Sequence, residues 1–160
     1  MDGVDPAQFR QLLGRFATGV TVVTTRDRAG RPIGMTASSV ASVSLAPPLV
    51  LVSVSQQHDM HAALNVAHRF VLNVLAADQE AISRRFAAEH PDRFEGIGYG
   101  ETEHGLPVLE GVLATIECEK QAEMPGGDHT VFIGRVTGGT VTNHRPLLYY
   151  RGGYAGLQGG

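Results

Sequence analysis

The pattern of apolar and polar residues along the chain predicts a mainly β fold. Residues 20–25 and 49–55 are apolar runs rich in β-branched side chains, which are typical of strands. Apolar and polar side chains alternate between residues 112 and 120, so this segment is expected to be a strand with one buried face. Similar runs predict further strands at residues 33–39, 69–75, 129–136 and 147–150.

A helix is expected near the N-terminus. Asp5 and Pro6 form a helix start, because an acceptor side chain caps the first turn and proline suits the first helical position. The helix is expected to end by Gly19. Four apolar residues at helical spacing predict one apolar stripe along it: Phe9, Leu12, Leu13 and Phe16.

Two shorter helices are expected later in the chain. Asp59 is expected to cap a helix that runs through Val66, and Asp78 to cap a helix over residues 79–89. Residues 90–107 are rich in Gly, Pro, His and charge, and predict a long loop. Because strands and helices do not alternate regularly, a doubly wound parallel sheet is disfavoured. The pattern favours a single domain, residues 1–160, built as a mainly antiparallel β-barrel with peripheral α-helices.

The composition narrows the class of protein. The chain of 160 residues is 42% hydrophobic and 18% charged, which favours a folded globule. The net charge is −3 and Lys120 is the only lysine, so nucleic acid is not expected as a partner. No run reaches the roughly 18 apolar residues of a membrane span, so no membrane is expected. The single Cys118 predicts a reducing cytoplasm and an unreactive core thiol. His58 and His61 lack a Cys or Glu partner on the same face, so no metal is expected.

The segment from Gly34 to Ser44 is rich in small hydroxyls and precedes an apolar strand. By itself it is typical of an edge strand, and that interpretation stays open. Gly34, however, allows a ligand to approach the backbone closely, and Pro47 and Pro48 are expected to stop strand pairing and free the preceding backbone groups. The next strand also ends in hydroxyls and amides, SVSQQHD. Two such ends side by side predict a polar, uncharged cradle for a heterocycle with a phosphate tail.

The common phosphate-binding fingerprints, GxxxxGK and GxGxxG opening a helix, are absent from the sequence. Phosphates are therefore expected at Ser or Thr hydroxyls, at the helix start over residues 55–59, or at arginine. Asp59 has the wrong charge for such a site and is expected to point away or to serve only as the cap. Arg84 and Arg85 are the best cationic candidates, although by themselves they fit a solvated helix face better.

Two further polar groups are candidates for chemistry. His129 opens a predicted strand after a Gly-Gly-Asp turn, where Asp128 is placed to orient or charge the imidazole; a plain polar edge residue is the alternative. The chain ends in LLYYRGGY. This stretch is either a terminal strand with Leu147 and Tyr149 packed inward, or an aromatic and cationic rim over a pocket.

Seven segments in this order resemble the flavin reductase-like family of FMN-binding split barrels, which includes the reductase components of two-component monooxygenases. They are FATGVTVVTT, GMTASSVASVSLAPPLVLVSVS, FVLNVL, ISRRFA, GLPVLEGVLATIEC, GDHTVFIGRV and PLLYYRGGY, and they span about residues 9–154. The resemblance implies an antiparallel split barrel and a homodimer. It also implies hydride transfer from NADH (or NADPH) to FMN or FAD, with reduced flavin supplied to a partner monooxygenase.

The resemblance also implies which residues bind the cofactors. The TASS segment would bind the isoalloxazine ring and ribityl chain: Gly34, Met35, Thr36, Ala37, Ser38 and Ser39. The end of the next strand and its loop would bind the ribityl chain and phosphate: Ser53, Val54, Ser55, Gln56, Gln57, His58 and Met60. Near the flavin tail would lie Arg85 and Phe86. His129 would be the catalytic residue that meets the nicotinamide. The same face would be lined by Tyr149, Tyr150, Arg151 and Gly152.

The sequence departs from the family pattern at a few positions. Val40 stands where Phe is frequent, which alters the packing under the ring. His58 and Asp59 stand where Ser or Thr is frequent, which leaves the choice between FMN and FAD open. NADH is favoured over NADPH, because no arginine cluster is set aside for a 2′-phosphate. Two alternatives stay open: a flavoprotein whose tightly bound flavin reduces another acceptor, and a flavin-binding module without reductase activity.

Overall fold

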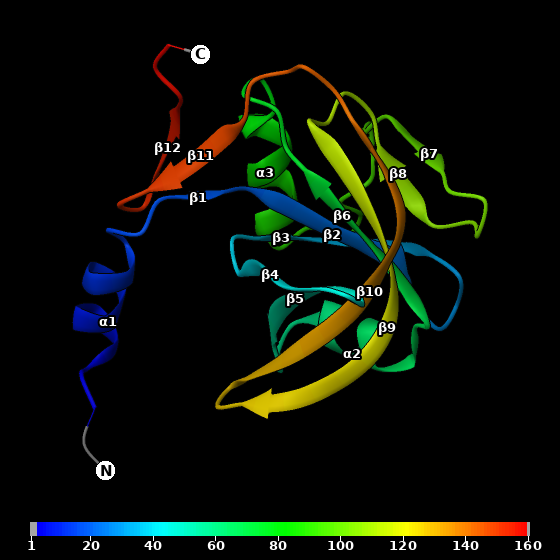
Figure 1. Ribbon diagram of the computed structural model, residues 1–160, viewed down its shortest axis with the longest axis horizontal. Helices are drawn as coiled ribbons and strands as arrows, with labels where there is room; N and C mark the ends of the chain where they lie inside the picture. The colour runs from blue at the N-terminus through cyan, green and yellow to red at the C-terminus, as the bar shows by residue number, and fades with distance from the viewer. Residues whose placement is uncertain (1–2, 160) are drawn as a thin grey trace.

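The computed structural model describes residues 3–159 and shows a mainly β protein built around one curved antiparallel sheet (Figure 1). Seven strands form this sheet in the order β3-β2-β6-β9-β10-β5-β4. They are β2 (Thr21–Arg26), β3 (Pro32–Ala37), β4 (Val40–Leu45), β5 (Pro48–Ser55), β6 (Arg69–Val74), β9 (Ala114–Gly126) and β10 (His129–Val141). Because only Ser38 and Ser39 separate β3 from β4, the two end strands are held together and the sheet curls into a barrel. The predicted antiparallel barrel with peripheral helices is confirmed.

Two apolar clusters form the core. Inside the barrel, the sheet meets the buried face of α2 (Asp59–Val66), and the fully buried side chains there include Val23, Val52, Leu72 and Phe132. The second cluster lies under α3 (Glu80–Ala87), where Phe86 packs edge-on against Phe94 with ring centroids 5.0 Å apart. This second cluster fixes α3 against the outer side of β3, where the candidate site is found.

Helix α1 (Pro6–Leu13) starts as predicted, with Asp5 as its N-cap. It ends at Gly14 rather than at Gly19, because the chain at Gly19 already pairs with another strand. None of its residues is buried, and the predicted apolar stripe is exposed: Phe9, Leu12, Leu13 and Phe16. Figure 1 shows α1 standing clear of the barrel. The helix therefore contributes nothing to the core of this chain.

The predicted caps of the other two helices are each wrong by one residue. The N-cap of α2 is His58, not Asp59, because His58 Nδ1 accepts a hydrogen bond from the N–H of Met60 at 3.0 Å. The N-cap of α3 is Gln79, not Asp78, and the Gln79 side-chain amide bonds two backbone groups of neighbouring loops. The Gln79 contact to Glu110 joins residues far apart in the sequence and has no local sequence signal.

Several strands lie outside the sequence prediction. β7 (Tyr99–Glu101) and β8 (Pro107–Leu109) form a hairpin in and after the predicted loop. The buried Asn73 holds this hairpin, since its Oδ1 accepts the N–H of Leu109 at 3.0 Å. A separate three-stranded sheet contains β1 (Thr18–Gly19), β11 (Leu147–Tyr150) and β12 (Gly153–Gly156). The prediction that residues 147–150 form the last strand is wrong, because β12 follows β11. Strands of two to four residues are too short to show a hydrophobic period.

The two longest strands, β9 and β10, extend beyond their predicted ends to 13 residues each. The adjacent glycines Gly138 and Gly139 do not interrupt β10, because a bulge after Val136 absorbs the irregularity and pairing with β9 continues. Cys118 on β9 is buried, which confirms the predicted core position, and burial raises the pKa of its thiol to about 12. Over residues 3–159, none of the helices has the length and apolar character needed to cross a membrane.

Candidate functional site

The hydroxyl-rich segment and the end of β5 meet at one point. Ser39 Oγ donates a hydrogen bond to the carbonyl of Ser53 at 2.9 Å and accepts one from the N–H of Ser53 at 3.3 Å. The short connection between β3 and β4 is thereby fastened to β5. The prediction that the two hydroxyl-bearing ends lie side by side is confirmed.

The expected role of the two prolines is wrong. Pro47 and Pro48 do not stop pairing: they connect β4 to β5 as a hairpin, in which Leu45 pairs with Pro48. Proline is tolerated at the first residue of a strand, so the ladder continues beyond it. β4 is an end strand of the sheet, and Ser42 and Ser44 are therefore residues of an edge strand.

His129 lies beside this junction as the first residue of β10. It stands opposite Ser55 in the ladder between β10 and β5, and Ser55 shares one face of β5 with Ser53. Asp128 Oδ1 lies 2.8 Å from His129 Nδ1, and this hydrogen bond lowers the pKa of the Asp128 carboxyl. The fold thus brings Ser39, Ser53, Ser55 and His129 together, and Asp128 is placed to orient the imidazole. Ser39, Ser53, Ser55 and His129 are called the serine–histidine junction.

The loop after β5 packs against the same junction. Gln56 Nε2 donates a hydrogen bond to the carbonyl of His129 at 3.3 Å, and the N–H of Gln57 donates to Ser55 Oγ at 3.3 Å. His58 follows as the cap of α2, and burial lowers the pKa of its imidazole. Of the predicted loop residues, Gln56 therefore contacts His129 and Gln57 contacts Ser55.

A cavity of about 220 Å³ lies on the outer side of β3. It is lined by residues of several elements, among them Thr36, Ser38, Ser83, Tyr149 and Tyr154. Thr36 Oγ1 donates a hydrogen bond to the carbonyl of Ser83 at 2.7 Å, so this hydroxyl proton is already engaged. Ser38, by contrast, is exposed. The three hydroxyls of the TASS segment therefore have three different surroundings.

Six of the residues predicted to bind flavin are buried in this chain: Gly34, Met35, Ala37, Val54, Met60 and Phe86. The expectation that Gly34 admits a ligand is wrong for this chain, because the ring of Phe86 covers it. A Cβ built on Gly34 would lie 2.7 Å from Phe86 Cε1. The glycine permits contact between β3 and α3, and these buried residues support the site from beneath.

The C-terminal YYRG segment is divided by the turn between β11 and β12. Only Tyr149 lines the cavity. The N–H of Arg151 donates to the carbonyl of Gly14 at 2.8 Å, and Arg151 adopts a left-handed backbone with φ of 51°. Tyr150 and Gly152 flank it in the same hairpin. Within one chain the structure therefore places Tyr150, Arg151 and Gly152 toward the N-terminal helix and not at the cavity.

The two arginines of α3 point to different neighbours. Arg85 Nη1 donates to the carbonyl of Glu95 at 2.8 Å and so supports the loop after α3. The guanidinium of Arg84 lies 4.9 Å from the centre of the Tyr154 ring. Arg84, rather than Arg85, thus stands next to a residue of the cavity. The sequence pattern did not separate Arg84 from Arg85, nor Tyr154 from the other residues of the LLYYRGGY stretch.

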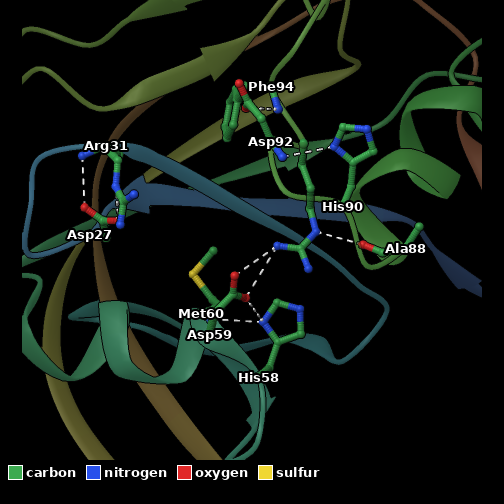
Figure 2. A network of polar contacts seen from close by, with 10 residues as sticks. Asp27, Arg31, His58, Asp59, Met60, Ala88, His90, Asp92 and Phe94 are labelled. Atoms are coloured by element: carbon green, nitrogen blue, oxygen red, sulfur yellow. Dashed lines mark hydrogen bonds and ion pairs between the residues drawn. The ribbon is translucent and has the colours of Figure 1, made fainter.

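A larger cleft, of about 480 Å³, lies between α2, β3 and the loop after α3 (Figure 2). Its two arginines are both paired: Arg31 with Asp27 at 3.1 Å, and Arg93 with Asp59 at 3.1 Å. Figure 2 shows Asp59 beside His58 at the start of α2. Asp59 therefore does not cap the helix but pairs with Arg93, and both arginines of this cleft are engaged with carboxylates.

Residues 13–158 match the protein family described as "Flavin reductase like domain". The chain belongs to this family. One relative of this flavin reductase domain, "Flavin-dependent monooxygenase, reductase subunit HsaB" of Rhodococcus jostii, is 42% identical over 98% of this chain and 80% of the relative. "FMN reductase (NADH) SmoA" of Agrobacterium fabrum is 41% identical over 95% of this chain and 86% of the relative. The solved structure of NADH:FAD oxidoreductase SgcE6 of Streptomyces globisporus has a TM-score of 0.91 at 38% identity and covers 99% of both chains.

Proposed function

We propose that this protein is an NADH-dependent flavin reductase, which transfers a hydride from NADH to FMN or FAD. The observation that carries the proposal is the serine–histidine junction on one face of the barrel, in a chain of the flavin reductase like family. NADH is named as the donor in the relatives from Agrobacterium fabrum and Streptomyces globisporus, while the flavin named is FMN in one and FAD in the other.

The chemistry of the junction fits a flavin. Serine hydroxyls and backbone amides are neutral donors and acceptors, which suit the polar edge of an uncharged ring and the hydroxyls of a ribityl chain. Beside them, the outward faces of β5 and β10 carry half-buried apolar side chains, which offer a flat ring a surface to lie on: Leu51, Val131 and Ile133. The residues present therefore match the group that the family implies.

The residues of this chain bind and orient the reactants. When bound, the two cofactors supply the redox chemistry, because the nicotinamide C4 of NADH gives a hydride to the flavin N5. Such a transfer depends on proximity and orientation and needs no acid–base pair from the protein. The proposal assigns the nicotinamide contact to His129, and its half-buried position beside Asp128 supports this role.

An absorbance assay tests the proposed function. Purified protein is mixed with NADH or NADPH and with FMN, FAD or riboflavin, and the nicotinamide absorbance is followed. We expect NADH to be oxidised with at least one flavin; no turnover with any pair removes the proposal. A yellow purified protein favours a tightly bound flavin that reduces another acceptor. Flavin binding without turnover favours a flavin-binding module.

His129→Ala is expected to raise the KM for NADH by about tenfold, since a contact of hydrogen-bond strength to the nicotinamide is lost. The dissociation constant of the flavin should change much less. Steady-state kinetics and flavin fluorescence quenching measure the two effects separately. His68→Ala, which removes an exposed histidine outside the junction, is the control. Equal damage to both constants, or to neither, contradicts the role of His129.

Ser38→Ala and Ser39→Ala are expected to differ. Ser38 has an exposed hydroxyl at the cavity, so its loss should weaken flavin binding by about three- to tenfold with no change in stability. Ser39→Ala removes both bonds to Ser53 and should lower the melting temperature as well. Ser42→Ala on the edge strand is the control and should change neither quantity. Identical behaviour of the two variants contradicts this division.

Two assemblies belong to the proposal. Reduced flavin is passed to a partner monooxygenase, a role supported by the relative from Rhodococcus jostii, which is named as the reductase subunit of such an enzyme. Two copies of the chain form a homodimer, a state supported by the uncovered apolar stripe of α1.

The lone, buried Cys118 supports a cytoplasmic location, where thiols stay reduced.

A further inference from the structure

Tyr154, the last residue of the LLYYRGGY stretch, lies where the C-terminal sheet meets α3. It is on β12 and pairs with Tyr149 of β11, and the two ring centroids are 5.3 Å apart with the planes at 75°. The guanidinium of Arg84 lies 4.9 Å from the centre of the Tyr154 ring. A cation over the ring face and an aromatic neighbour in edge contact together fix the orientation of this ring.

The hydroxyl of Tyr154 is linked to β3 through one buried serine. Tyr154 Oη and Ser83 Oγ are 2.7 Å apart, and Ser83 is fully buried on α3. The carbonyl of the same Ser83 accepts the hydrogen bond from Thr36 Oγ1 at 2.7 Å. A continuous set of polar contacts therefore joins the C-terminal sheet, α3 and the TASS segment.

These contacts enclose the cavity of about 220 Å³. Tyr149 and Tyr154 contribute its aromatic side, and Thr36 and Ser38 contribute its hydroxyl side. Ser38 follows Thr36 by two residues, and both line the cavity. Because Ser83 is buried, loss of its partner would leave its hydroxyl without compensation by water.

We propose that Tyr154 is a positioning residue for flavin binding. It holds Ser83, and through Ser83 it holds Thr36 and Ser38 in the orientation in which they face the ligand. This inference rests on the proposed function and extends it to a residue of the last strand. Tyr154 acts through its neighbours, so its effect falls on flavin affinity and not on the KM for NADH.

Tyr154→Phe tests the inference, because it removes the hydroxyl and keeps the ring under Arg84. The dissociation constants of FMN and FAD are measured by fluorescence quenching of the full chain, without NADH. We expect both flavins to bind about three- to tenfold more weakly, the size of one lost neutral hydrogen bond. The KM for NADH should stay within twofold of wild type. Tyr99→Phe is the matched control, since Tyr99 lies on β7 outside this cavity.

Ser83→Ala provides the second variant. It removes the other hydroxyl of the pair and leaves the backbone carbonyl for Thr36. Ser83→Ala should weaken flavin binding as Tyr154→Phe does, and the double variant should be no worse than either single one, because coupled residues are not additive. An unchanged flavin affinity in Tyr154→Phe, additive effects, or equal losses for flavin and NADH overturn the inference. A wild-type protein that neither binds flavin nor oxidises NADH instead overturns the proposed function, and this inference with it.

Discussion

Gly34→Ala is expected to destabilise the fold by about 1–3 kcal/mol, the usual cost of inserting a methyl group into a packed core. The new Cβ would lie 2.7 Å and 2.8 Å from two ring atoms of Phe86 and 3.4 Å from Val22 Cγ1. Phe86 is fully buried and is held in turn by Phe94, so its ring has no free space to enter. The added methyl group therefore pushes α3 away from β3.

Denaturant unfolding of the purified variant measures this effect, and the melting temperature should fall by about 2–4 °C for each kcal/mol. Gly100→Ala is the matched control, because a Cβ on Gly100 meets nothing within 4 Å. The cost of Gly34→Ala should shrink when Phe86→Leu is added, since the smaller side chain leaves room for the methyl group. A neutral Gly34→Ala, or one that Phe86→Leu does not relieve, contradicts the close contact between β3 and α3.

The double variant Leu12→Glu, Phe16→Glu is expected to convert a homodimer into monomers. An isolated helix shorter than about 12 residues is marginal in water. α1 has eight residues, none of them buried, and Phe16 is 73% exposed just beyond its end. Burial of a leucine or phenylalanine contributes about 1.5–3 kcal/mol, so a second copy that covers the stripe gains substantially from it. Two carboxylates in the same interface remove this gain and add a desolvation cost.

Size-exclusion chromatography with light scattering measures the result. The wild type should have twice the 17.0 kDa mass of the chain, and the double variant should have that mass once. Gln11→Glu adds one carboxylate on the opposite face of α1 and should leave the dimer intact. Full NADH oxidation by the monomeric variant would show that the junction works within one chain. A monomeric wild type, or a dimeric double variant, contradicts the role of α1.

Local sequence signals predicted the elements that are long or strongly patterned. β2 was predicted from a run of β-branched residues, and β9 from the alternation of apolar and polar side chains. The N-terminal helix was predicted from its apolar spacing and its Asp5 cap. The other two helices were predicted from Asp59 and Asp78, although their observed caps are His58 and Gln79. The hairpin of β7 and β8 was missed because it is held by Asn73, a residue from a different part of the chain.

The candidate site was likewise predicted in part from local residue types, while tertiary contacts decided the rest. Residue types alone indicated a neutral polar cradle, because several Ser and Thr hydroxyls cluster at two strand ends without a carboxylate between them. The bond of Ser39 to Ser53 and the position of His129 opposite Ser55 confirm that these ends meet. The separate places of Tyr149 and Arg151 could not be predicted, since they depend on a turn with a left-handed residue between two short strands.

The sequence by itself determined the β-rich class, the positions of the main strands along the chain and the chemical character of the site, because these follow from composition and from patterns within one segment. The tertiary structure alone decided which hydroxyls are engaged and which are exposed, that Phe86 covers Gly34, that Arg93 neutralises Asp59, and that Tyr154 reaches Ser83. Each of these contacts joins residues from different elements. Their formation depends on how the sheet curls and where α3 packs, and no local pattern carries that information.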